Sequence, residues 1–280
     1  MRATVLLSAL AATLAAPAFA ADLDGADVPP AERSLRLGLG VGFAPTYEGA
    51  DDYRATAFPI IQPSFGSGPS RVDFRGLDDI RIAVLPASRF RFGPVIGYTF
   101  GRDESDDARL TGLGDVDGGL VLGGFVGYDL VAEEDLRFGV AVAYTQQVTG
   151  DVFQTATVPG LTDEFGAEID FGASGGVRLS ERLDLTARAG AVYATDDYMD
   201  ALFGISAVQA ANSALPAYDP GAGIKSAYVR ADVNFDLTDR IQLRAGLGYS
   251  RLVGDAGDSP VVADRNQFDG QVGASYKFRF

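Results

Sequence analysis

The chain has 280 residues, a formal net charge of −15, and neither cysteine nor histidine. The acidic balance disfavours nucleic acid as a partner. Disulfides are excluded, and so is any active site or metal centre that needs histidine, which is the commonest general base and transition-metal ligand.

The N-terminal residues have the pattern of a secretory signal peptide. Arg2 precedes an apolar run over residues 5–16, and Ala18-Phe19-Ala20 offers a cleavage site. The run is too short for a spanning helix, which needs about 20 residues. We therefore predict a signal peptide over 1–20, a polar periplasmic lead over 21–33, and a folded region over 34–280. The alternative is a buried N-terminal helix.

From residue 34 onward, apolar and polar residues alternate with the period of two that is typical of strands with two different faces. The segment 270–280, GQVGASYKFRF, shows the pattern. We predict twelve strands, with ten as the alternative, and the third and fourth have the weakest pattern. The predicted strands are 34–47, 53–66, 70–77, 79–86, 89–100, 118–131, 135–149, 165–180, 183–197, 223–237, 240–254 and 267–280.

The strand lengths and connections favour a closed antiparallel transmembrane β-barrel. Many strands exceed the roughly 9–11 residues that a tilted strand needs to cross a bilayer. Short turns, such as 132–134 and 238–239, alternate with long loops, such as 101–117 and 198–222, as in bacterial outer-membrane barrels. With an even number of strands, the first strand begins and the last strand ends on the short-turn side of the barrel, which we expect to be the periplasmic side. The alternative is a soluble β-sandwich exported to the periplasm.

The barrel must close, because an open edge in hydrocarbon leaves backbone groups unpaired. Phe280, which follows an alternating strand, resembles the signal that the barrel-assembly machinery of Gram-negative outer membranes reads. The apolar face of each strand is predicted to meet lipid. The inward faces carry glycine and many ions of both signs, so we expect arginine–carboxylate contacts to fill most of the lumen, with a selective arginine-lined channel as the alternative.

Two pairs of carboxylates are candidates for chemistry. Glu168 and Asp170 lie on one strand face, where an interior ion-pair ladder is favoured over acid–base catalysis. Asp115 and Asp117 lie in the glycine-rich segment GLGDVDGG and could ligate Ca²⁺, but the remaining ligands of an EF-hand loop are missing. A turn with solvated acids is favoured there. No catalytic residue, metal or cofactor is predicted.

Several segments resemble the MltA-interacting protein (MipA/OmpV) family of outer-membrane proteins over nearly the whole mature chain. The most specific pieces are PTYEG (45–49), LGDVD (113–117) and DSPVV (258–262). The resemblance implies a non-enzymatic protein of the cell outer membrane, in contact with lipid and lipopolysaccharide. It also implies a scaffold that links a lytic murein transglycosylase to a penicillin-binding synthase.

Other members of the family are described as adhesins or in connection with antibiotic responses, so a narrow channel for small solutes and a surface adhesin remain alternatives. The family supplies no catalytic residues to carry over. The candidate binding residues lie in loops, and they are Asp115, Asp117, Asp258, Ser259 and Pro260. The loop 198–222 is partly apolar, and we predict that it folds back as a lid or plug.

Overall fold

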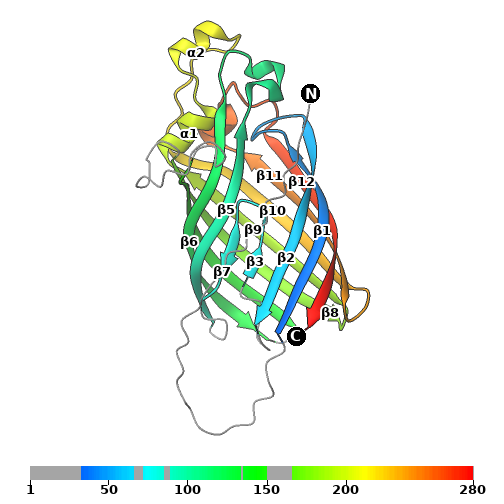
Figure 1. Cartoon of the computed structure of the whole chain (residues 1–280). Helices are drawn as coiled ribbons and strands as arrows, with labels where there is room; N and C mark the ends of the chain where they lie inside the picture. The colour runs from blue at the N-terminus through cyan, green and yellow to red at the C-terminus, as the bar shows by residue number, and fades with distance from the viewer. Residues whose placement is uncertain (1–32, 66–71, 85–88, 134, 150–165, 280) are drawn as a thin grey trace. The chain divides into compact units, whose positions relative to one another are not determined.

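The computed structural model describes residues 33–65, 72–84, 89–133, 135–149 and 166–279. They form one antiparallel sheet of twelve strands that curls into a barrel (Figure 1). The predicted signal peptide, the lead up to residue 32 and Phe280 lie outside the described residues. The strands are β1 (Arg33–Pro45), β2 (Tyr53–Phe65), β3 (Val72–Phe74), β4 (Ile80–Ile82), β5 (Phe90–Arg102), β6 (Val116–Ala132), β7 (Leu136–Gln147), β8 (Ala167–Ser180), β9 (Leu183–Ala194), β10 (Gly223–Asp236), β11 (Ile241–Leu252) and β12 (Asn266–Arg279).

The predicted all-β, twelve-stranded fold is confirmed, and most strand bounds lie within a few residues of the expected ones. The exceptions are β3 and β4, which are three residues each instead of eight. The first and last strands pair with each other, with Ser34 opposite Arg279. The start of β1 and the end of β12 therefore lie together at the short-turn end, as predicted.

The sheet begins at β2 and ends at β3, with every other strand paired on both sides. Among the described residues no ladder joins β2 to β3, which differs from the expectation of hydrogen bonding all the way round. The sequence of β2 carries prolines at 59 and 63. Proline has no N–H to donate and is tolerated at a sheet edge. Because the two prolines are four residues apart, both missing donors fall on the same side of β2.

The outward faces are apolar along the whole barrel. Leu39, near the middle of β1, is 73% exposed, and Val272 on the neighbouring β12 is 61% exposed. Exposure of this kind is costly in water and expected in lipid, so the prediction that every second side chain meets hydrocarbon fits the sheet.

Outward aromatic residues gather near the two ends of the strands. Ring pairs at the long-loop end are Phe43–Tyr53, Tyr98–Phe100 and Tyr249–Phe268, and those at the short-turn end are Phe90–Phe92 and Tyr276–Phe278. Two such belts are typical of barrels that cross a bilayer, because amphipathic rings favour the level of the lipid headgroups.

Small inward residues make room for bulky neighbours inside the barrel. A Cβ on Gly40 of β1 would lie 2.5 Å from the ring of Phe58, which points inward from β2. Deeper along the wall, Val95, Phe125 and Ala143 form a buried apolar patch. The segment after β4 packs on this patch through Ala83. The β3–β4 hairpin is therefore drawn inward from the edge of the sheet.

Loops at the long-loop end pack into two apolar clusters. The loop between β9 and β10 contains α1 (Asp196–Phe203) and α2 (Ala207–Asn212), and α3 (Gly254–Asp258) follows β11 (Figure 1). Phe203 is fully buried against Leu252 and Ala256, while Ile205 joins the other cluster. The loop 198–222 thus packs against neighbouring loops, and its role as a lid or plug stays a prediction.

The remaining helical segments are short, namely the 3-10 turns η1 (Glu104–Asp106) and η2 (Ala108–Leu110) between β5 and β6. None of the helices within the described residues has the length and apolar character that crossing a membrane requires.

Replacing Leu39 with arginine tests the lipid-facing assignment. We expect the Leu39→Arg substitution to lower the free energy of unfolding in lipid vesicles by about 2–4 kcal/mol, because it places a charge near the bilayer midplane. The measurement is denaturant unfolding followed by the change in gel mobility between folded and unfolded barrel. The matched control Leu39→Phe should change stability little. Equal stability of the arginine variant and the wild type would contradict the assignment.

Candidate functional site

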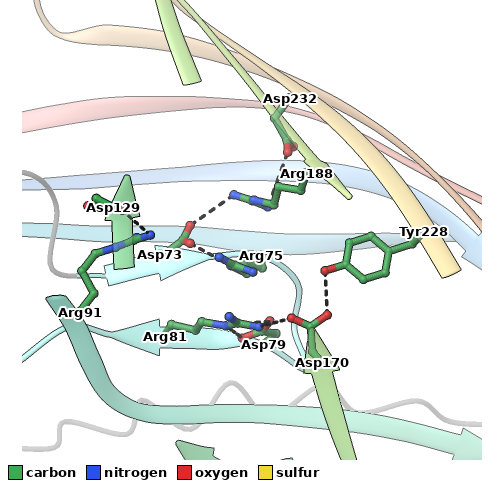
Figure 2. A network of polar contacts seen from close by, with 10 residues as sticks. All are labelled: Asp73, Arg75, Asp79, Arg81, Arg91, Asp129, Asp170, Arg188, Tyr228 and Asp232. Atoms are coloured by element: carbon green, nitrogen blue, oxygen red, sulfur yellow. Dashed lines mark hydrogen bonds and ion pairs between the residues drawn. The ribbon is translucent and has the colours of Figure 1, made fainter. Parts of the chain in front are cut away.

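The β3–β4 hairpin crosses the barrel interior and meets side chains of the opposite wall. Asp73 lies in β3 and Arg75 directly after it, while Asp79 lies directly before β4 and Arg81 within it (Figure 2). Backbone pairing anchors the hairpin to the sheet, with Arg81 opposite Val95 of β5. The hairpin thus places four charged side chains in the lumen while its backbone stays paired with β5.

Arg81 is the centre of the first branch of this network. Its guanidinium donates to Asp79 at 2.8 and 2.7 Å and to Asp170 of β8 at 3.1 Å. Asp170 also accepts a hydrogen bond of 2.7 Å from the hydroxyl of Tyr228 on β10. Arg81 lies over the ring of Phe125 at 5.7 Å and is only 2% exposed. One arginine therefore joins the hairpin to two distant strands.

A second branch joins the hairpin to β9. Asp73 accepts from Arg75 at 2.9 Å and from Arg188 at 3.3 Å. Arg188 also lies 3.6 Å from Asp232 of β10, which is 2% exposed (Figure 2). Charges buried in this way are stable only where each has partners, because their desolvation is costly. The charged residues of the hairpin and those of the wall therefore depend on each other for partners.

The hairpin divides the interior into two cavities. The larger, of about 710 Å³, lies toward the long loops, and the smaller, of about 270 Å³, lies toward the short turns. Arg75, Arg81 and Arg188 line both cavities. These three guanidinium groups therefore stand between the two halves of the lumen.

A separate cluster surrounds Lys225 at the loop end of β10. Its ammonium donates to Glu48 at 2.7 and 2.8 Å, to the hydroxyl of Tyr198 at 2.8 Å, and lies 2.7 Å from Glu168. The ammonium also sits 4.4 Å from the centre of the Tyr198 ring, a cation–π contact. Burial, and next the charge of Glu168, raises the pKa of the Tyr198 hydroxyl well above its usual value. The phenol thus stays protonated and can donate to Glu48 at 3.1 Å.

The Lys225 cluster connects four parts of the chain. Glu48 comes from the β1–β2 loop, Glu168 from β8, Tyr198 from α1 and Lys225 from β10. The same β1–β2 loop turns at Gly49, where φ is +100° and a Cβ would lie 2.8 Å from Val262. The Lys225 cluster therefore holds the β1–β2 loop and α1 on the barrel wall, and the turn at Gly49 brings the β1–β2 loop close to Val262.

The structure separates the two carboxylates that the sequence placed on one strand face. Glu168 pairs with Lys225, whereas Asp170 pairs with Arg81. Both carboxylates thus form interior ion pairs, as the sequence predicted. Arg91 with Asp129, and Arg36 with Asp236, add further inward pairs at 2.8 and 3.5 Å.

Most of the candidate binding residues predicted from the sequence make contacts within or between loops. Asp115 accepts from the backbone N–H of Glu104 at 2.7 Å. Asp117 lies in β6 and not in a loop as predicted, and it is an exposed residue that lines the larger cavity. Asp258 pairs with Arg265 at 2.6 Å.

Ser259 is 4% exposed and donates to the carbonyl of Phe203 at 2.6 Å, next to the half-buried Pro260. Ser259 therefore holds two loops together. A group that binds from solution would need to be more accessible.

Three exposed or half-buried carboxylates near the loops could approach a cation. Asp51, Asp52 and Asp107 place one oxygen each within 4.8 Å of one another. This group does not include the predicted Asp115 or Asp117, and exposed acids are common without a metal.

Sequence reasoning missed Glu48, Tyr198, Lys225 and Tyr228. Two signals were present. Lysine occurs only at 225 and 277, whereas arginine supplies the other basic residues, and Glu48 lies inside the PTYEG motif.

The comparison with known protein families assigns this chain to one of them. The model of a family described as MltA-interacting protein MipA matches residues 37–278. The chain belongs to the MltA-interacting protein family. YiaT of Escherichia coli K12, which bears the name of an outer membrane protein, is 29% identical over 97 residues. The same match is found with YiaT of Escherichia coli O157:H7. It covers 35% of this chain and 39% of YiaT, so it spans less than half of the relative.

Solved structures with similar folds include the NanC porin, with a TM-score of 0.41, 10% identity, and coverage of 89% of this chain and 100% of that chain. The outer membrane protease OmpT from Escherichia coli has a TM-score of 0.33 and 13% identity, covering 90% of this chain and 98% of OmpT. Ail of Yersinia pestis has a TM-score of 0.27 and 12% identity, covering 89% of this chain and 99% of Ail. The family, the named relative and the lipid-facing sheet agree that this member of the MltA-interacting protein family is an outer-membrane protein.

Replacing Lys225 with methionine tests the cluster at the loop end. We expect the Lys225→Met substitution to cost about 3 kcal/mol of stability, because it leaves Glu48 and Glu168 close together without their counter-ion. The measurement is the temperature at which the folded band is lost on a gel. Adding Glu168→Gln to the lysine variant should restore part of the loss. A double variant that is no more stable than Lys225→Met alone would contradict this account.

Proposed function

We propose that this outer-membrane protein is a non-enzymatic interaction protein, a scaffold for envelope partners, whose barrel does not conduct. The observation that carries the proposal is the hairpin network inside the lumen. It spans from β3 to β10, and Arg81 at its centre is nearly inaccessible to solvent. An ion-pair network that spans the lumen would block an open pore.

The energetics of the network support an occluded lumen. A solute that passed from one cavity to the other would have to displace Arg75, Arg81 or Arg188 from carboxylates that they contact at 2.7–3.6 Å. Breaking one buried pair costs about 3–5 kcal/mol, since a charge is left without a partner. The loops that pack together above the larger cavity would further restrict the passage of a solute.

The family description supports a partner. It names MltA, and we infer that this chain binds the corresponding lytic murein transglycosylase, with a penicillin-binding synthase as the second partner of the scaffold. Both would approach from the periplasm, which we expect at the short-turn end, where β1 begins and β12 ends. The described turns there expose charged residues of both signs, including Glu181 and Arg240. A mixed polar surface suits a reversible protein contact.

A second candidate function is a narrow channel for small solutes. The observation that favours it is the presence of a cavity on each side of the hairpin, with three arginines shared between them. Movement of the hairpin would connect the cavities and give a path lined by guanidinium groups.

Planar-bilayer recordings separate these two functions. We expect the wild type to be silent, because the hairpin network stays closed. The double variant Arg75→Gln and Arg81→Gln should conduct, since the hairpin loses its contact with Asp170 of β8 and the internal pair between Arg75 and Asp73. Arg178→Gln is the matched control, because Arg178 pairs with Asp184 at 3.2 Å outside both cavities. Steady conductance by the wild type would favour the channel.

Site-specific crosslinking in intact cells tests the scaffold. We expect a photoreactive residue at position 181, in the β8–β9 turn, to capture the cell's own murein transglycosylase. The matched control is position 208, where Val208 of α2 is 71% exposed at the opposite end of the barrel. Capture from 208 alone would favour a surface adhesin, and capture from neither position would overturn the scaffold.

A further inference from the structure

The larger cavity, of about 710 Å³, has an excess of negative charge that remains after every ion-pair partner is counted. The cations on its lining are Arg54, Arg75, Arg81, Arg188, Lys225 and Arg230. The anions on its lining are Glu48, Asp78, Asp79, Asp117, Glu168, Asp170 and Asp269.

Ion pairs extend this set without balancing it. Within the described residues, the six cations also pair with Asp73, Asp106 and Asp232, and these carboxylates bring in no further cation. The complete set thus has ten anions and six cations. Arg244, an inward arginine of β11 with no ion pair to any described residue, would reduce the excess only from four to three. The interior above the hairpin therefore favours an added cation.

Two of these carboxylates are both accessible and without a partner. Asp78, in the turn of the hairpin, and Asp117, at the start of β6, are exposed side chains that line the cavity. Neither forms an ion pair, or a side-chain hydrogen bond with another residue, in the part of the chain that the structure describes. Glu48 and Glu168 in addition share the single ammonium of Lys225. A cation that enters the cavity thus finds acceptors that it can reach.

The same cavity already holds one ammonium group. Lys225 Nζ lies 2.7 Å from Glu48, 2.7 Å from Glu168 and 4.4 Å from the centre of the Tyr198 ring. All four residues line the cavity. Carboxylates and aromatic faces are the groups that bind alkylammonium ions in proteins. The Lys225 cluster is therefore an internal example of amine recognition in this lumen.

The two free carboxylates lie at different depths. A Cβ on Gly97 of β5 would lie 2.1 Å from the backbone oxygen of Asp78, so the turn of the hairpin rests on β5 there. Asp117 lies opposite Gly101 of the same strand, which is closer to the long loops. Four residues of a strand span about 13 Å. A linear molecule with an amine at each end fits this spacing.

We propose that the larger cavity binds a small organic cation, a linear amine with an ammonium group at each end. One ammonium pairs with Asp78 on the hairpin, and the other pairs with Asp117 near the loops. The cavity volume lies within the range of small-molecule sites, roughly 300–1,000 Å³. Because the hairpin separates the cavity from the short turns, the amine enters from the loop end. The site goes beyond the scaffold function and needs no protein partner.

Calorimetric titration of the purified protein in a non-ionic detergent tests the site. The probes are spermidine and calcium chloride, each at constant ionic strength maintained with sodium chloride. We expect saturable binding of spermidine at one site. Asp78→Asn and Asp117→Asn should each weaken it about tenfold, the effect of losing one charge-assisted hydrogen bond. Asp78→Glu should keep part of the affinity.

Asp219→Asn is the matched control, because it removes an exposed carboxylate from the loop end of the barrel without touching the cavity. Its affinity for spermidine should equal that of the wild type, and gel mobility checks that every variant is folded. The proposal is overturned if spermidine does not bind beyond sodium, or if Asp78→Asn binds it as tightly as the wild type. An equal loss in Asp219→Asn would also overturn it, since that would indicate a diffuse negative field around the loops. Binding of calcium without spermidine would overturn it in favour of a metal site.

Discussion

Backbone hydrogen bonding in a solvent that offers none is the constraint on which this structure depends. Inside hydrocarbon, each N–H and C=O must find a partner in a neighbouring strand, at several kcal/mol for each failure. Ten of the twelve strands are 12 or more residues long, and β1 pairs with β12, the last strand. Within the described residues, only β2 among these ten lacks a ladder on one side. Once the ladder satisfies the backbone, the two faces of each strand are free to differ. The outward face becomes apolar, and the inward face becomes a place where charge can be kept.

Keeping charge inside imposes a second requirement, which the hairpin fulfils. Arg188 and Asp170 face inward from the wall, too far from solvent to remain without partners. Asp73 and Arg81 of the hairpin reach them at 3.3 and 3.1 Å. The hairpin and the wall are thus complementary, and neither would be stable with its charges if the other were removed.

The sequence predicted much of the fold because a period of two is strong over ten or more residues. It predicted inward ions of both signs for the same reason, and it placed Asp170 on one strand face with Glu168. It could not predict that 72–84 leaves the wall, since an alternating segment has the same pattern whether it continues a sheet or folds beneath it. The contact of Lys225 with Glu48, which are 177 positions apart, depends on how loops and wall meet in space. Ser259 looked accessible in a polar loop, yet its hydroxyl is used to tie that loop to Phe203.

The aromatic belts fix the thickness of membrane that this protein prefers. On β12 the belts are marked by Phe268 and Tyr276, eight residue steps apart. At about 3.4 Å per residue and a tilt of about 40°, those steps span roughly 20 Å along the membrane normal. That height is short of the roughly 30 Å core of a typical bilayer. Lipids that surround the barrel must therefore shorten their chains toward it, and the protein should partition into the thinnest membrane of the cell.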